Sequence, residues 1–98
     1  MEKRLPFVTI IVPCRNEEKF IEKCLQSIIS QDYPKEKLEI LVVDGRSEDN
    51  TRNKIQKIIN KIPDTRYQIQ LLDNPKKITP AAMNIGIKNA KGDIIIKM

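Results

Sequence analysis

Hydrophobic residues along this chain form short continuous runs that alternate with longer stretches of helical spacing. Residues 8–12 and 38–43 are mainly apolar or β-branched, the pattern of strands buried on both faces of a parallel sheet. Residues 67–72 alternate apolar and polar side chains, which predicts a half-buried strand nearer an edge. Residues 93–98 predict a fourth strand.

Amphipathic or small-residue helices are expected between these strands. Apolar side chains recur every three or four positions in residues 20–29 and 55–62, and the third helix is expected over residues 81–90. Ala81, Ala82 and Gly86 would let that helix approach the sheet closely. The predicted boundaries are N-caps at Asn16, Ser47 and Thr79 (before Pro80), and helix ends at residues 32–34, residues 63–64 and Gly92.

Strands and helices therefore alternate, which predicts an α/β fold: a Rossmann-like, three-layer domain with a four-stranded parallel sheet and helices on both faces. Right-handed crossovers give the strand order 3-2-1-4. The order reverses between strands 1 and 4, and open α/β sheets bind ligands at such a point, beyond the carboxyl ends of the strands. The loop at residues 13–17 occupies that position.

Composition narrows the function further. The 98 residues carry a formal charge of +5 and no histidine. The lysines are spread along the chain, so nucleic acid is not an expected partner, although the positive charge would help to hold a polyphosphate. Without histidine, the chain lacks the commonest zinc ligand and the usual acid/base group at neutral pH.

Two cysteines, Cys14 and Cys24, are spaced like neither a zinc knuckle nor a redox pair, so both are expected to be free thiols. Cys24 lies on the apolar side of the first helix and is expected in the core. No signal peptide and no run of about 20 apolar residues is present, so the expected location is the cytoplasm.

Three segments should meet at the switch point: residues 13–17, Asp44 and residues 74–79. A carboxylate such as Asp44 accepts hydrogen bonds from a ring N–H or a ribose hydroxyl, and Arg15 or Lys77 suits phosphate. Together they suit a nucleotide. The alternatives are a turn role for Asp44 and solvated surface charges for the two cations.

Other classes of protein with a doubly wound α/β fold differ in how well they fit the sequence. Neither G-x-G-x-x-G nor G-x-x-x-x-G-K-[ST] occurs, which argues against dehydrogenases and P-loop NTPases. A receiver-type signalling domain is a weak alternative, with Asp44 as phosphoacceptor, but residues 13–15 lack the acidic side chains that such a site needs. A non-catalytic nucleotide-binding or assembly module is a stronger alternative.

Residues 8–17, 41–51 and 81–93 together resemble the successive N-terminal motifs of family 2 inverting glycosyltransferases, which have the GT-A fold. The resemblance covers nearly the whole chain. Residues 74–80 are similar to members that build exopolysaccharides such as succinoglycan. Residues 1–98 would then be the N-terminal nucleotide-binding part of a glycosyltransferase domain.

The resemblance implies a UDP-sugar, or another NDP-sugar, as donor. It places Pro13, Arg15 and Glu17 around the base and ribose, makes Asp44 the carboxylate that reads a uracil-type base, and gives Lys77 a phosphate or base contact. The family's Asp-x-Asp metal motif would follow Met98. The resemblance therefore places the ligands for Mg²⁺ or Mn²⁺, the catalytic base and the sugar or lipid-linked acceptor site outside this chain.

These implications lead to three further expectations. The 98 residues alone contain no catalytic or metal-binding residues and are expected to be inactive. The longer protein could associate with the cytoplasmic face of the membrane. Because the fourth strand lies at an open edge and carries residues 94–96, all isoleucine, the chain is expected to form a homodimer through it.

Overall fold

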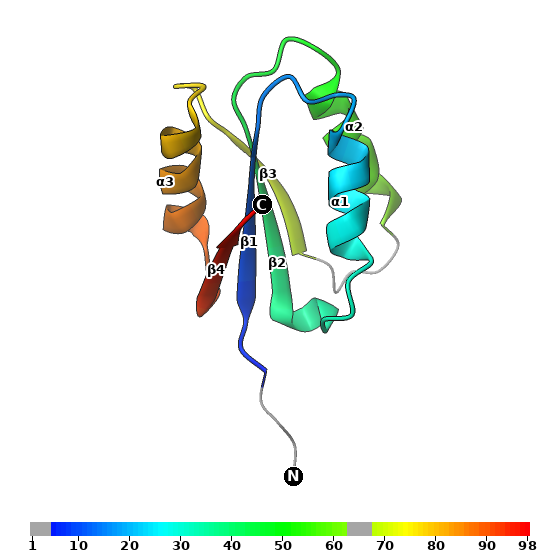
Figure 1. Cartoon of the computed structure of the whole chain (residues 1–98), viewed down its shortest axis with the longest axis vertical. Coiled ribbons are helices and arrows are strands. Elements are labelled where there is room, and N and C mark those ends of the chain that lie inside the picture. Colours follow the sequence, from blue (N-terminus) through cyan, green and yellow to red (C-terminus); the bar gives the residue numbers. More distant parts are fainter. Residues whose placement is uncertain (1–4, 63–67) are drawn as a thin grey trace.

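The computed structural model describes residues 5–62 and 68–98, which form a three-layer α/β structure (Figure 1). Strands and helices alternate along the chain, as the hydrophobic pattern predicts. The elements are β1 (Val8–Cys14), α1 (Ile21–Ile29), the 3-10 turn η1 (Lys35–Lys37), β2 (Leu38–Asp44), α2 (Thr51–Lys61), β3 (Gln68–Asp73), α3 (Thr79–Asn89) and β4 (Ile94–Lys97).

The sheet has the order β3-β2-β1-β4, and every neighbouring pair is parallel. Val8 is in register with Leu38 of β2 and with Ile94 of β4, so the strands start at nearly the same level. The predicted order 3-2-1-4 is therefore confirmed. The carboxyl ends of β1 and β2 meet where Cys14 pairs with Asp44.

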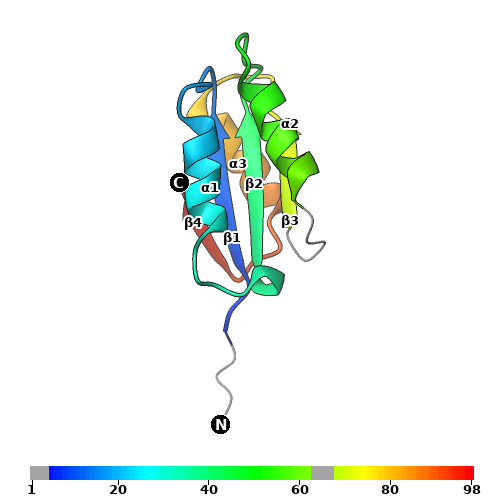
Figure 2. The same cartoon turned by 90° about the vertical axis from the view of Figure 1, so that its right-hand side faces the viewer.

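Helices cover both faces of this sheet. Helices α1 and α2 lie side by side on one face and α3 lies on the other (Figures 1 and 2). The larger core fills the space under α1 and α2, where Leu25, Ile28 and Ile55 are fully buried. The smaller core joins Ile11 and Val43 to Ala82 of α3. The three-layer prediction is confirmed.

Helix α3 packs unusually close to the sheet. A Cβ placed on Gly86 would lie only 2.7 Å from side-chain atoms of Ile11, which is itself fully buried. Ala82 is 2% exposed. The predicted close approach through small residues is therefore confirmed at Ala82 and Gly86.

All three predicted N-caps are wrong, and two of the residues, Asn16 and Ser47, have another role. Helix α1 begins at Ile21 and α2 at Thr51, and the residues in their N-cap positions, Phe20 and Asn50, make no side-chain capping bond. Asn16 and Ser47 instead form hydrogen bonds between the β1–α1 and β2–α2 loops. Their polar side chains serve contacts between loops, which the local sequence does not reveal.

Other boundaries shift by a few residues. Helix α3 begins at Thr79, so Ile78 occupies the N-cap position and the predicted N-cap Thr79 is wrong by one residue. The helix ends at Asn89, before the predicted end at Gly92, because the backbone of Ala90 is already extended. Helix α1 ends at Ile29, before residues 32–34. The predicted end of the second helix at residues 63–64, and the first residue of the third strand, Tyr67, lie outside the described residues.

Strand β4 lies at one edge of the sheet and pairs only with β1 in the part of the chain that the structure describes. Its side chains Ile94, Ile95 and Ile96 are 45%, 41% and 43% exposed. The predicted edge position of this strand is confirmed. Within residues 5–62 and 68–98, no helix has the length and apolar character needed to cross a membrane.

A buried carboxylate ties the start of β4 to the middle of the sheet. Glu39 of β2 is 2% exposed, and its Oε1 accepts hydrogen bonds from the hydroxyl of Thr9 at 2.7 Å and the backbone N–H of Lys91 at 2.6 Å. The Thr9 hydroxyl oxygen also accepts from the N–H of Gly92 at 2.9 Å. We call Thr9, Glu39, Lys91 and Gly92 the β4 anchor.

Candidate functional site

Three loops meet at the carboxyl edge of the sheet, as the strand order predicts. The N–H of Gly45 donates to the carbonyl of Cys14 at 2.8 Å, which joins the β1–α1 and β2–α2 loops. The N–H of Asn74 donates to the carbonyl of Asp44 at 2.9 Å, which brings in the β3–α3 loop. The predicted convergence of residues 13–17, Asp44 and residues 74–79 is confirmed.

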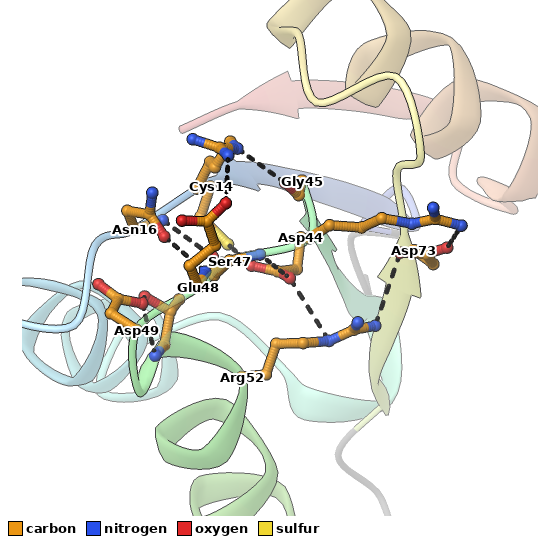
Figure 3. A network of polar contacts seen from close by, with 12 residues as sticks. Cys14, Asn16, Asp44, Gly45, Ser47, Glu48, Asp49, Arg52 and Asp73 are labelled. Atoms are coloured by element: carbon orange, nitrogen blue, oxygen red, sulfur yellow. Dashed lines mark hydrogen bonds and ion pairs between the residues drawn. The ribbon is translucent and has the colours of Figure 1, made fainter.

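The first two loops are also joined through their side chains (Figure 3). Asn16, whose φ of 55° is left-handed, accepts at Oδ1 from the N–H of Glu48, and its own N–H donates to the Ser47 hydroxyl, both at 2.8 Å. The N–H of Glu17 donates to the Thr51 hydroxyl at 2.8 Å. Asp49 accepts from Thr51, and these bonds hold the pKa of its carboxyl below the usual value.

Asp44 is the centre of this polar network (Figure 3), and its side chain is fully buried. Its carboxylate accepts from both the N–H and the hydroxyl of Ser47, the former at 3.0 Å. The Nε of Arg52 lies 3.4 Å from Oδ2, and the thiol of Cys14 donates to Oδ1 at 3.7 Å. A buried carboxylate needs such partners, because an unpaired charge in the interior is costly.

Arg52 was not among the predicted site residues. It lies in the first turn of α2, where its Nη2 also approaches Asp73 of β3 at 3.7 Å. Arg46 pairs with the same carboxylate at 3.3 Å. A cation in the first turn of a helix is unfavourable because of the helix macrodipole. The position of Arg52 in the sequence could therefore have indicated that it pairs with an acidic residue.

Neither cysteine forms a disulfide, as predicted. Cys14 is half-buried, and burial together with the nearby Asp44 carboxylate raises the pKa of its thiol to about 12. It therefore stays protonated and acts as a hydrogen-bond donor at neutral pH. Cys24 packs partly buried against the larger core, as expected, and burial raises the pKa of its thiol.

The loops enclose a hollow of about 180 Å³. Four of the five predicted site residues line it, whereas Asp44 lies behind the thiol of Cys14 and does not reach the hollow surface. Lys76, the neighbour of Lys77 in the chain, lines a separate hollow beside α3. The lining residues are Pro13, Cys14, Arg15, Glu17, Asn74, Lys77, Ile78, Thr79 and Ala82.

Two cations flank Gly45 at this hollow. Arg15 donates through Nε to the Gly45 carbonyl at 3.0 Å and approaches Glu48 at 3.8 Å. A Cβ on Gly45 would lie 3.2 Å from the Cα of Lys77 and 3.3 Å from Cδ of Arg15, so glycine allows this close approach. Within the described residues, the ammonium group of Lys77 forms no ion pair.

A parallel sheet with a polar hollow at its topological switch point is the architecture of α/β domains, which commonly bind ligands at that point. Comparison with known sequences identifies the protein family to which this domain belongs. The profile of the family described as Glycosyl transferase family 2 matches residues 9–98. The chain belongs to this family, and its sheet is that of the GT-A fold.

Relatives and solved structures agree with this assignment. A dolichyl N-acetyl-α-D-glucosaminyl phosphate 3-β-D-2,3-diacetamido-2,3-dideoxy-β-D-glucuronosyltransferase of Methanococcus voltae is 46% identical over 90 residues, which cover 92% of this chain and 27% of that protein. The structure of mannosyltransferase PcManGT from Pyrobaculum calidifontis, in complex with GDP-Man and Mn²⁺, superposes on this chain with a TM-score of 0.85 and 35% sequence identity. The match covers 92% of this chain and 26% of the PcManGT chain.

TarS residues 1–349 from S. aureus, in complex with UDP, superposes with a TM-score of 0.76 at 28% identity and covers 93% of this chain and 26% of its own. The chain thus spans about a quarter of the length of the Methanococcus protein and of these two solved chains. None of the three is described as a succinoglycan enzyme, so that narrower resemblance remains a prediction.

The part of the chain that the structure describes contains no cluster of side chains suited to a divalent metal. In residues 5–62 and 68–98, no three side chains of His, Cys, Asp or Glu lie close enough together to hold a metal ion. Asp44 is already occupied by Ser47 and Arg52.

Proposed function

We propose that this chain binds the nucleoside diphosphate part of a nucleotide-sugar donor for a glycosyltransferase. The observation that carries the proposal is the hollow itself, where Arg15 and Lys77 flank Gly45 directly above the buried Asp44 network. Cations beside a polar hollow suit phosphate oxygens, and a carboxylate suits the N–H groups of a base. The complexes of PcManGT with GDP-Man and of TarS with UDP support this class of ligand.

Each predicted residue then has a role. Pro13 and Glu17 would line the base and ribose, and Arg15 and Lys77 would contact phosphate or base. Asp44 would read the base by exchanging its weakest partner: at 3.7 Å, the thiol of Cys14 is the longest of its contacts and a weak donor. A base N–H that replaces this thiol keeps Asp44 fully paired.

For the longer protein we propose inverting transfer of the sugar to a sugar or lipid-linked acceptor. A carboxylate outside this chain would take the proton of the acceptor hydroxyl. The ligands for Mg²⁺ or Mn²⁺ would also lie outside it. The name of the Methanococcus relative includes a dolichyl N-acetyl-α-D-glucosaminyl phosphate, which supports a lipid-linked acceptor and a site of action at the membrane surface for the longer protein.

We expect the 98-residue chain to bind UDP with a dissociation constant in the millimolar range, about −4 kcal/mol, because it supplies only part of the donor site. Titration followed by NMR should move the amide signals of residues 14–17 and 44–47. Asp44→Asn, which keeps the shape of the side chain, should weaken binding at least tenfold, a loss of about 1.4 kcal/mol. Lys57→Ala, on the exposed side of α2, is the matched control. Unmoved signals at these loops, or equal binding by the Asp44 variant, would contradict the proposal.

We also propose that two copies of this chain associate through the exposed edge of β4. An unpaired strand edge with apolar side chains is a template for pairing. Sedimentation velocity at high concentration should show a dimer that Ile95→Lys dissociates. Ile87→Lys, at a residue of α3 that is 50% exposed, should leave the dimer intact. A monomer at every concentration would count against this association.

A further inference from the structure

The net positive charge of this chain is concentrated on one side of the sheet. Lysines occur throughout the sequence, but acidic residues do not. Residues 16–61, which include α1, β2 and α2, carry nine basic and nine acidic side chains and are neutral in sum. Residues 74–98, which include α3 and β4, carry five lysines against one aspartate. Because α3 covers the face of the sheet opposite to α1 and α2 (Figure 1), the two faces differ in charge.

The outward face of α3 carries part of this surplus. Ala82 and Gly86 are the buried residues of the helix and face the sheet. The helical repeat therefore turns Asn84, Ile87 and Lys88 away from the sheet, and all three are exposed. Ile87, at 50% exposure, places an apolar side chain beside the charged one.

Two further exposed lysines flank this face. Lys76 precedes α3 and shares a hollow of about 230 Å³ with Asn84 and Lys88, and Lys91 follows the helix. We call Lys76, Asn84, Ile87, Lys88 and Lys91 the α3 patch. Among residues 5–62 and 68–98, no acidic side chain lines this hollow, and none of the three ammonium groups of the patch forms an ion pair.

These unpaired charges restrict what can cover the α3 patch. Burial of an unpaired ammonium group against protein is costly, so the patch is unsuited to a further packed layer. A second copy would place lysines against lysines. Nucleic acid is attracted by lysines too, but residues 74–98 contain neither arginine nor aromatic residues, which commonly contact bases.

A membrane interface satisfies both kinds of side chain in the patch. Lysine ammonium groups stay in contact with water and with negatively charged headgroups, while an apolar side chain enters the boundary of the acyl chains. Each lysine near an anionic lipid surface contributes about fivefold to the affinity.

We propose that the α3 patch docks on a membrane surface that contains anionic phospholipids. This inference rests on the membrane site of action proposed above for the longer protein, and it assigns that site to one face of this chain. The patch adjoins the hollow proposed for the nucleotide, because Asn74 lines both hollows and α3 begins at Thr79, which lines the nucleotide hollow. Docking through α3 therefore holds the nucleotide hollow close to a lipid-linked acceptor.

The test is flotation of the 98-residue chain with lipid vesicles at low salt. We expect vesicles of equal parts phosphatidylcholine and phosphatidylglycerol to bind at least tenfold more tightly than vesicles of phosphatidylcholine alone. Lys88→Gln combined with Lys91→Gln should weaken this binding about 25-fold, the effect of two lysines. Lys57→Gln combined with Lys61→Gln is the matched control, because it removes the same charge from exposed positions of α2 and should weaken binding less than threefold.

A second measurement uses the unchanged chain. A spin-labelled lipid in small anionic bicelles should broaden the amide NMR signals of residues 84–91 more than those of residues 53–61. Equal broadening of the two helices, equal binding to both kinds of vesicle, or equal loss in the two lysine pairs would overturn this inference.

Two further outcomes separate the alternatives. Tighter binding to a short DNA duplex than to the anionic vesicles, lost in the Lys88 and Lys91 variant, would identify nucleic acid as the partner and overturn the membrane assignment. Titration of the same chain with UDP tests the proposed donor site independently. Binding of UDP without vesicle binding would remove this inference and leave the donor site standing, and vesicle binding without UDP binding would do the reverse.

Discussion

Replacement of Glu39 by leucine is expected to lower the free energy of unfolding by about 2–5 kcal/mol. The leucine fits a strand but removes the acceptor shared by the Thr9 hydroxyl and the Lys91 N–H, so two donors in the β4 anchor lose their partner. Each unpaired buried donor costs about 1–3 kcal/mol. A loss of this size is a large part of the total stability of a small domain.

Urea denaturation of the wild-type chain and the variants measures this loss. Glu39→Gln keeps a carbonyl oxygen at the same position and is expected to be destabilised by less than half as much as the leucine variant. If both variants unfold at the same urea concentration, the loss comes from the carboxylate charge, and the hydrogen-bond account of the β4 anchor is wrong. If the leucine variant is as stable as the wild type, the anchor does not stabilise the fold.

Replacement of Gly92 by alanine is expected to destabilise the chain by about 2–4 kcal/mol, through overpacking. The added Cβ would lie 2.5 Å from Oγ1 and 2.6 Å from the backbone nitrogen of Thr9, and 3.0 Å from the carbonyl oxygen of Phe7. Two of these three atoms are backbone atoms, one just before β1 and one within it, so no side-chain rotation relieves the clash. The segment before β4 must move away from β1 and lose the bond from Gly92 to Thr9.

Thermal and urea unfolding should both show this loss. Lys91→Ala is the matched control, because Lys91 is exposed and contributes its backbone N–H to the anchor. We expect the control to unfold within about 0.5 kcal/mol of the wild-type chain. Equal stability of the Gly92 and Lys91 variants would show that the start of β4 can shift without cost.

The sheet could be predicted because its determinants are local or general. The runs of apolar residues in β1 and β2 predict strands that are buried on both faces of a parallel sheet. Right-handed crossovers between successive strands then favour the strand order 3-2-1-4. That order places residues 13–17, Asp44 and residues 74–79 at one edge, so four of the five predicted site residues line the hollow.

The remaining features depend on pairs of residues far apart in the chain. Asn16 and Ser47 are residue types that commonly cap helices. Only the folded structure shows that Asn16 instead forms hydrogen bonds with the β2–α2 loop, at Ser47 and Glu48. Glu39 lies within an otherwise apolar strand, and its partners, Thr9 and Lys91, are 30 and 52 residues away. Asp44 was expected at the ligand, and its complete burial could not be derived without the positions of Ser47 and Arg52.

The reciprocal hydrogen bonds between the first two loops also constrain how this site can be re-engineered. The N–H of Asn16 needs the hydroxyl of Ser47, and the N–H of Glu48 needs the amide oxygen of Asn16. A graft of the β1–α1 loop alone would leave the Glu48 N–H without its acceptor unless the grafted loop also has an asparagine there. A graft of the β2–α2 loop alone would leave the Asn16 N–H without its acceptor unless the grafted loop also has the serine. The β1–α1 and β2–α2 loops therefore form a single structural module, and libraries that test the proposed donor site by loop exchange should vary them jointly.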